Sequence, residues 1–215
     1  MQKAEDNMFY ILCVAFSLLS YICGSLNGAI ILSKAIYGVD IREKGSKNPG
    51  FTNFKRVFGG GAAWLAMLID SLKTIVPLLA ACITFDMLYD SWQLAAAMCG
   101  FFAMVGHAYP VFYNFKGGKA FITGETVVWF VDWRVGIIVT VVFLILLFTM
   151  HYMSVASIVS AILNPVSLCI LGVSSPFVLV FSVLSAALLI WRHKANIKRL
   201  INNEESKFYF KKKSA

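Results

Sequence analysis

Long apolar segments alternate with short polar ones along most of this chain. A helix that crosses a bilayer needs about 20 mainly apolar residues. Segments of this kind lie near residues 9–34, 61–85, 93–113, 137–152, 153–173 and 176–192. A shorter apolar piece, residues 121–134, has Glu125 near its start and Asp132 and Arg134 at its end. The pattern predicts an all-α fold, a polytopic transmembrane helical bundle.

The composition agrees with a membrane protein. Of the 215 residues, 59% are hydrophobic and 14% are charged, whereas soluble domains have about 25% charged residues. The formal net charge is +8. In a membrane protein, the simpler explanation of a surplus of basic residues is that they keep loops on the cytoplasmic side, rather than that they bind nucleic acid. The five cysteines stand singly in apolar segments, without a Cys-x-x-Cys pair or a Cys/His cluster. The sequence therefore predicts no metal site, no cofactor and no nucleic-acid partner.

The distribution of charge predicts the topology. Basic residues concentrate in segments 37–60 and 114–119 and after Trp191, whereas segment 86–92 has two aspartates and no basic residue. Basic loops of membrane proteins face the cytoplasm, so all three basic regions are expected there. The chain must then cross an even number of times between 114–119 and its tail, which makes residues 121–134 a crossing.

This argument predicts about seven spans, with the N-terminus outside and the C-terminus in the cytoplasm. We expect one integral membrane domain, residues 1–215, whose last residues, 206–215, form a basic cytoplasmic tail. The lipid bilayer is its predicted surrounding. The sequence does not define an oligomeric state.

Three polar clusters, residues 40–56, 106–123 and 191–205, lie on the same side of the predicted membrane. Glycines in the first two allow the backbone to approach a ligand closely, and arginine provides a planar fork suited to phosphate. A helix that starts after a glycine-rich turn presents free N–H groups to an anion. The clusters together predict a cytoplasmic site at membrane level for more than one phosphate.

Two smaller patterns add candidate groups. Arg192, Asn196 and Arg199 have the spacing of one helical face if the last span continues as a helix beyond the membrane. Asp70 and Lys73 are one helical turn apart inside the second span, where they most simply neutralise each other. An ionisable pair at that depth is also a candidate for a functional role.

In this order and spacing, the clusters resemble the bacterial acyl-phosphate:glycerol-3-phosphate acyltransferases. The family's loop D-I-R-x-x-G-S-G-N-x-G-A-T-N-x-x-R is similar to DIREKGSKNPGFTNFKR here, and its F-K-G-G-K-G-x-x-T and R-H-x-x-N-I-x-R-L stretches resemble FKGGKAFIT and RHKANIKRL. The resemblance runs from about residue 20 to residue 208. Lys47, Ala120 and Asn203 stand where the family pattern has glycine.

The resemblance implies a function and a location. Members of the family transfer a fatty acyl group from acyl phosphate to the 1-hydroxyl of glycerol 3-phosphate, giving lysophosphatidic acid and phosphate in the first step of phospholipid synthesis. Acyl phosphate and glycerol 3-phosphate are therefore the expected substrates. The expected place is the plasma membrane of a bacterial cell, with the active site facing the cytoplasm.

The resemblance also implies roles for individual residues. The residues expected closest to the chemistry are Ser46, Thr52, Asn53 and His193. The residues expected to bind the substrates are Ser46, Asn48, Gly50, Arg56, Lys116, Gly117, Gly118, Lys119 and Asn196, together with Arg42 and Glu205, which would also hold the loops together. Either His193 or a phosphate oxygen of the acyl donor is compatible with the role of base.

Other functions fit the sequence less well. Acyltransferases that use acyl-CoA or acyl carrier protein depend on a His-x4-Asp pair, which is absent here, because the residues five positions after His107, His151 and His193 are Phe112, Ala156 and Lys198. The main alternative is a transporter or flippase for a small anionic solute or lipid head group. Transporters often contain internal repeats, and none is evident. A membrane scaffold would explain the lysines but not the spacing of the small polar residues around them.

Overall fold

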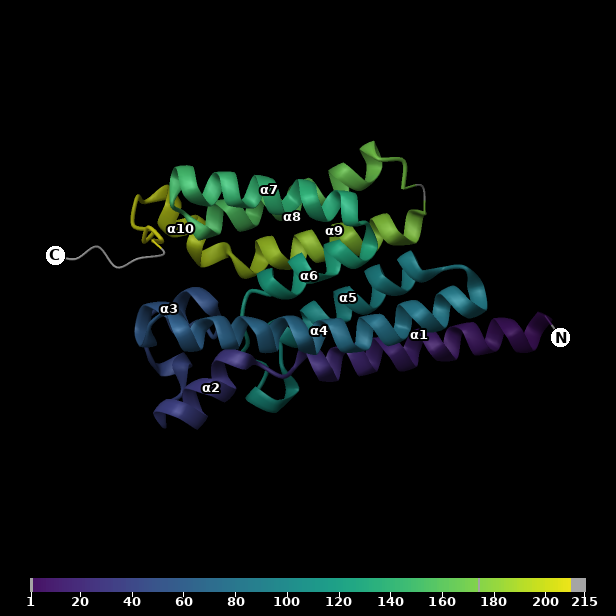
Figure 1. Cartoon of the computed structure of the whole chain (residues 1–215), viewed down its shortest axis with the longest axis horizontal. Coiled ribbons are helices and arrows are strands. Elements are labelled where there is room, and N and C mark those ends of the chain that lie inside the picture. Colours follow the sequence, from purple (N-terminus) through teal and green to yellow (C-terminus); the bar gives the residue numbers. More distant parts are fainter. Residues whose placement is uncertain (1, 174, 210–215) are drawn as a thin grey trace.

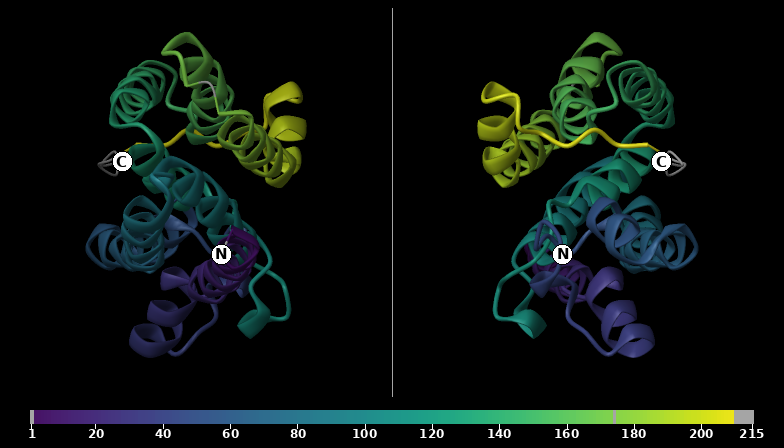
Figure 2. Two further views of the ribbon diagram at one scale, coloured as in Figure 1. Left: turned by 90° about the vertical axis from the view of Figure 1, so that its right-hand side faces the viewer. Right: turned by 90° about the vertical axis from the view of Figure 1, so that its left-hand side faces the viewer.

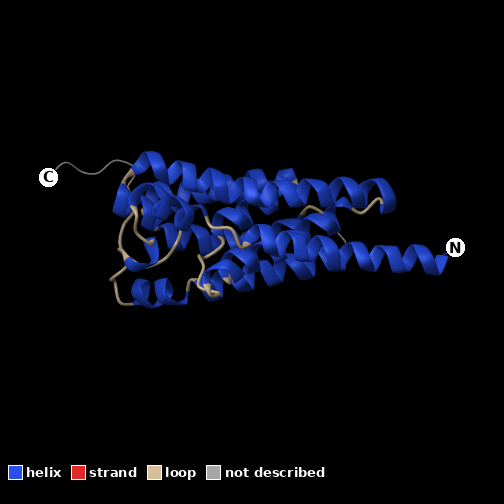
Figure 3. Cartoon of the chain, turned by 90° about the horizontal axis from the view of Figure 1, so that it is seen from below, coloured by secondary structure: helices blue, strands red, loops and turns tan. Residues whose placement is uncertain are grey.

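The computed structural model describes residues 2–173 and 175–209, so residues 210–215 of the predicted basic tail lie outside the described part. The helices are α1 (Gln2–Gly24), α2 (Gly28–Tyr37), α3 (Phe51–Phe58), α4 (Gly60–Tyr89), α5 (Trp92–Ala108), α6 (Phe121–Val131), α7 (Trp133–Met150), α8 (Met153–Ile170), α9 (Pro176–Arg192) and α10 (Lys194–Ile201), with short 3-10 helices η1 (Ile41–Glu43) and η2 (Val111–Tyr113). No strand occurs among the described residues (Figure 3). The all-α prediction is confirmed.

Helices α1 to α4 form one half of the molecule, and α7 to α10 form the other, with α5 and α6 between them (Figure 1). Helix α5 packs against α1, α4, α6 and α9. Small residues allow these close approaches, as is usual between helices in membranes. A β-carbon on Gly24 of α1 would overlap the backbone of Ala103, and one on Gly106 of α5 would overlap the carbonyl oxygen of Tyr21.

The apolar outer faces fit a lipid surrounding. Val14 and Leu18 of α1 and Ile145 and Phe148 of α7 are all exposed. By length and composition, the described residues contain five candidate spans, or six if the bent pair α9–α10 is counted as one. Helix α6 is an apolar helix of 11 residues, shorter than the 17 or so residues that a full crossing usually needs. The protein is a multi-pass membrane protein.

Two breaks interrupt the helical path, one inside the first predicted span and one directly after the last predicted span. The first predicted span contains an interruption after Gly24, and α2 restarts at Gly28, where the side chain of Asn27 accepts a hydrogen bond from Ile30 N. The second break falls at His193, where the axes of α9 and α10 diverge by 56°. The shared helical face expected for Arg192, Asn196 and Arg199 required the helix to continue beyond the last span, and this bend shows that the condition is not met.

A short segment after α10, residues 205–209, crosses from one half of the molecule to the other (Figure 2), and we call it the C-terminal clasp. The amide of Phe208 donates to the carbonyl oxygen of His151 at 2.7 Å. The Phe208 ring is buried beside Leu147 and Ala156, and Lys55 of α3 donates to the carbonyl oxygen of Tyr209. The clasp thus joins α3 to the α7–α8 turn.

Candidate active site

A cavity of about 550 Å³ lies where the two halves meet at the end of the molecule that carries α3 and α10. All three polar clusters contribute to its lining. The predicted site residues that line it are Ser46, Asn48, Gly50, Thr52, Asn53, Arg56, Lys119, His193, Asn196 and Glu205. The structure therefore brings most of the predicted site together.

Asn53 holds the first loop in shape. Its side-chain oxygen accepts from Ser46 N at 2.8 Å, and its amide nitrogen donates to Lys44 O at 3.0 Å and Ile41 O at 3.5 Å. The residue is 1% exposed. Because these backbone groups occupy its polar atoms, the geometry gives Asn53 a positioning role and sets Ser46 at the cavity.

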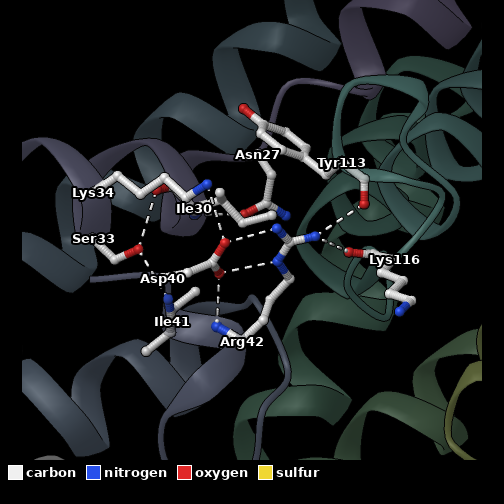
Figure 4. Close-up of polar contacts among 9 residues, drawn as sticks. All are labelled: Asn27, Ile30, Ser33, Lys34, Asp40, Ile41, Arg42, Tyr113 and Lys116. Carbon is white, nitrogen blue, oxygen red and sulfur yellow. Dashed lines mark hydrogen bonds and ion pairs between the residues drawn. The ribbon is translucent and has the colours of Figure 1, made fainter. Parts of the chain in front are cut away.

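Arg42 ties the first loop to the second one (Figure 4). Its guanidinium pairs with both carboxylate oxygens of Asp40 at 3.0 and 2.7 Å. It also donates to the carbonyl oxygens of Tyr113 and Lys116, at 2.9 and 3.4 Å. The hydrogen bonds from Arg42 hold the pKa of Asp40 well below its usual value. Neither Arg42 nor Lys116 lines the cavity, so the loop-holding role fits Arg42 better than contact with substrate.

Gly117 and Gly118 also lie outside the lining. Arg192 donates to both of their carbonyl oxygens, at 2.9 and 3.0 Å, and Gly118 N donates to His107 O at 3.0 Å. A β-carbon on either glycine would overlap atoms of His107. The two glycines thus allow the loop to pack on the end of α5, and their backbone does not form the phosphate cradle that the sequence suggests. Lys119, the next residue, does reach the cavity.

Lys119 belongs to a buried polar network. Its ammonium donates to the side-chain oxygen of Asn196, and Asn196 in turn donates to Glu205 at 2.6 Å. Burial, together with the positive charges of Arg199, Arg192 and Arg56, lowers the pKa of Lys119 to about 8, although the charge of Glu205 opposes the change. A bound anion would compensate the burial of this ammonium.

Glu205 of the clasp connects α8 with α10. It accepts hydrogen bonds from Ser154 of α8 at 2.9 Å, from Asn196 of α10 at 2.6 Å and from Arg199 at 2.7 Å. Burial acts to raise the pKa of this carboxyl group, but the three donors outweigh it and hold the pKa below its usual value. The charged form of Glu205 is therefore part of the folded structure.

His193 stands at the bend between α9 and α10 and is 3% exposed. Its Nδ1 lies 2.8 Å from the carbonyl oxygen of Leu189. A carbonyl oxygen can only accept, so the ring proton is on Nδ1 and Nε2 carries a lone pair. Since His193 lines the cavity, this nitrogen can accept a hydrogen bond from a substrate hydroxyl.

Two helices begin at the cavity without a side-chain cap. Helix α3 starts after Gly50, and α6 starts after Ala120. Residues of both first turns line the cavity. The first N–H groups of a helix have no partner within the helix and attract anions. Together with Arg56 and Lys119, these two helix ends make one side of the cavity favourable for phosphate.

Another part of the cavity lining, next to the two helix ends, is apolar, and the sequence gives no clear signal for it. It is formed by Trp64, Met67, Phe143, Leu144 and Leu147. Trp64 and Leu144 are also partly exposed on the outer surface, at 46% and 40%. The ring of Phe51 packs against Trp64 at 4.9 Å between centroids. The apolar wall therefore continues from the cavity to the lipid-facing surface, as an acyl chain would require.

Two further residues, Asp70 and His107, line the cavity. The sequence marks Asp70 as a candidate through its spacing from Lys73, and the structure confirms this pairing at 2.8 Å. His107 is not among the predicted site residues, and the signal that could have found it is its place in the second polar cluster, residues 106–123.

The positions where glycine is replaced share one backbone property. Lys47, Ala120 and Asn203 have φ angles of 60°, 60° and 56°. Residues with a side chain rarely adopt this left-handed region, at a cost of about 1–2 kcal/mol, and asparagine adopts it most readily. The backbone thus keeps the conformation that glycine favours after the glycine has been replaced.

Comparison with known proteins agrees with this geometry. A family model described as glycerol-3-phosphate acyltransferase matches residues 14–203. A glycerol-3-phosphate acyltransferase of Methylococcus capsulatus is 38% identical over 188 residues, covering 87% of this chain and 92% of the relative. One of Macrococcus caseolyticus is 36% identical over 195 residues, covering 91% and 96%.

A solved structure is also similar. The crystal structure of PlsY (YgiH), an integral membrane glycerol 3-phosphate acyltransferase in its glycerol 3-phosphate form, superposes with a TM-score of 0.84 at 34% identity, covering 92% of this chain and 96% of that one. These similarities favour an acyltransferase over a transporter. The chain belongs to the glycerol-3-phosphate acyltransferase family.

Proposed function

We propose that this acyltransferase takes its acyl group from an acyl phosphate and transfers it to the 1-hydroxyl of glycerol 3-phosphate. The main support is the cavity, whose lining combines an apolar wall with two uncapped helix ends, Arg56 and Lys119. Each substrate carries a phosphate, and only the donor carries a long hydrocarbon chain. The similar crystal structures were solved in glycerol 3-phosphate and lysophosphatidic acid forms, which correspond to the acceptor and the product of this reaction.

The reaction balances without a further reactant. The 1-hydroxyl oxygen attacks the acyl carbonyl carbon, an ester C–O bond forms, and the bond between this carbon and the phosphate oxygen breaks. The hydroxyl proton ends on the departing inorganic phosphate. Donors fixed around the phosphate and the developing oxyanion stabilise the transition state, and holding both substrates in contact lowers the entropic cost.

In this scheme His193 orients the hydroxyl, and the phosphate takes the proton. The hydrogen bond from Nδ1 to Leu189 fixes the ring so that Nε2 can accept from the hydroxyl. For His193→Gln we expect a higher KM for glycerol 3-phosphate and a smaller change in kcat. A variant that keeps its KM but loses turnover would make His193 the base.

We propose that the end of the molecule with α3 and α10 faces the cytoplasm of a bacterial cell, at the plasma membrane. Helices α2, α3 and α10 carry basic residues and lie at the end opposite the start of α1 (Figure 1). Basic segments stay on the cytoplasmic side. If α6 counts as a short crossing, the chain has seven spans, its N-terminus is outside, and residues 1–215 form one domain.

The first experiment supplies the purified protein with labelled glycerol 3-phosphate and either palmitoyl phosphate or palmitoyl-CoA. We expect lysophosphatidic acid from palmitoyl phosphate alone. Lys119→Ala should abolish it, whereas Lys116→Ala, a matched change outside the cavity, should not. Product from palmitoyl-CoA would overturn the assignment of the donor. If folded protein made no product but carried glycerol 3-phosphate into liposomes, the transport alternative would replace the proposed function.

A further inference from the structure

A buried chain of three ionisable groups lies beneath the substrate loops. Asp70, Lys73 and His107 are 3%, 7% and 4% exposed. Lys73 Nζ is 2.8 Å from Asp70 Oδ1 and 2.8 Å from His107 Nδ1, and it also donates to the carbonyl oxygen of Leu26. The carboxylate of Asp70 is held in turn by Gly28 N at 3.1 Å.

These contacts determine where the His107 ring carries its proton. An ammonium has three N–H donors, and Asp70, Leu26 and His107 accept one each. Nδ1 of His107 must therefore be an acceptor, because a proton on Nδ1 would place two donors face to face. The remaining proton is on Nε2, so His107 is a neutral ring that donates from Nε2.

The Nε2–H group lies beside the backbone of Gly118, next to the cavity. His107 lines it, and a β-carbon on Gly118 would overlap Nε2, so the absence of a side chain at Gly118 lets the ring edge reach the surface of the loop. Among residues 2–173 and 175–209, no group accepts a hydrogen bond from Nε2. Nε2 is not among the buried side-chain atoms that lack a partner, so this donor keeps accessible surface, and an oxygen atom of a ligand in the cavity could accept its hydrogen bond.

We propose that His107 is a further substrate-binding residue, whose Nε2–H donates a hydrogen bond to a phosphate oxygen of a substrate, and that Lys73 and Asp70 position its ring in the donating tautomer. The inference rests on the proposed function, since it takes its acceptor from a phosphate-bearing substrate. The proposal places His107 and His193, in opposite tautomeric forms, at the same cavity. His107 donates to a phosphate, whereas His193 accepts from a hydroxyl.

The kinetic test compares His107→Leu with His107→Gln, whose side-chain amide can still donate in the place of Nε2. For His107→Leu we expect the KM of one phosphate substrate to rise at least about tenfold, the factor typical of a hydrogen bond to a charged group. His107→Gln should recover most of it. Whether the KM rises for palmitoyl phosphate or for glycerol 3-phosphate identifies which phosphate is bound. Unchanged KM values for both substrates in His107→Leu would overturn the proposal.

A spectroscopic test works without a mutation at the ring and without turnover. In protein labelled with 15N-histidine, we expect one neutral ring protonated on Nε2 and one protonated on Nδ1. His151→Asn, a change outside the cavity, removes the third histidine signal and should leave both KM values unchanged. Adding glycerol 3-phosphate, or separately inorganic phosphate, should shift the Nε2–H signal. In Lys73→Gln, the proton should no longer be confined to Nε2.

The two readouts separate the two proposals. A wild-type protein that makes no lysophosphatidic acid, yet shows the Nε2–H signal moving with phosphate, would refute the proposed reaction and retain the phosphate contact. An active enzyme with the His107 proton on Nδ1, or with an Nε2–H signal that saturating phosphate and glycerol 3-phosphate leave unmoved, would refute the role of His107 alone.

Discussion

Replacing Glu205 by glutamine should loosen the C-terminal clasp. Glutamine keeps an oxygen that can accept from Ser154 and Asn196, but it places an NH2 group opposite the donating Nε of Arg199. A hydrogen bond between charged groups contributes about 1.5–3 kcal/mol. Because the Arg199 side chain is 39% exposed, solvent screening weakens this hydrogen bond, and we use a reduced value of about 1–2 kcal/mol.

This loss predicts a measurable increase in local opening. A change of about 1–2 kcal/mol multiplies the open population by about 5 to 30. The amide of Phe208, which is bonded to the carbonyl oxygen of His151 at 2.7 Å, reports that opening by hydrogen exchange. We therefore expect its exchange to become about 5 to 30 times faster in Glu205→Gln.

The matched control is Glu204→Gln, which removes the same charge from an exposed neighbour. It should leave the exchange of the Phe208 amide unchanged. Equal protection of this amide in Glu205→Gln and wild type would refute the assignment of the clasp to the Glu205 network. Equal acceleration in both variants would attribute the effect to net charge instead. Because the folded pKa of Glu205 is depressed, its contribution is present above the unfolded pKa near 4.3 and is lost as the pH falls further.

Three other predictions follow from backbone and charge. Lys47→Gly should stabilise the protein by about 0.5–1 kcal/mol, because the gain from removing left-handed strain is partly offset by the greater flexibility of the unfolded chain. Asn203→Gly should change the stability less. Thermal unfolding of both variants in detergent tests this. Gly118→Ala should lower the unfolding midpoint and kcat/KM because its β-carbon overlaps the imidazole beneath it, whereas Gly61→Ala, with no atom within 4 Å of its β-carbon, should not. If Lys119 binds phosphate as an ammonium, kcat/KM for glycerol 3-phosphate should fall as the pH rises through about 8. Lys119→Arg should move that fall to higher pH. A wild-type profile that is flat between pH 7 and 9.5 would contradict this role.

The all-α, multi-pass membrane fold and much of the polar part of the cavity lining could be predicted from the sequence. A bilayer requires long apolar helices, and their lengths are visible as uninterrupted hydrophobic segments. The polar residues between them must then gather at the membrane surface, which is why Ser46, Arg56, Lys119 and Asn196 lie around one cavity.

The local geometry could not be predicted in the same way. The break at His193 leaves no mark in hydropathy, because polar residues follow the last span whether the helix continues or bends by 56°. A glycine pair between two lysines is compatible both with binding a ligand and with close packing of the backbone. Only the position of Arg192 and of the end of α5 shows that Gly117 and Gly118 serve packing.

The clasp also has a consequence for biosynthesis. Chains are made from the N-terminus, and domains fold progressively as they emerge. Residues 205–209 follow all ten α-helices of the described part of the chain, so they leave the ribosome after these helices have been made. Until Glu205 arrives, Asn196 and Arg199 lack their shared carboxylate, and until Phe208 arrives, α3 and the α7–α8 turn remain unjoined. The cavity is therefore completed only after residues 205–209 have been made, and a chain truncated before them can insert into the membrane without acquiring a finished site.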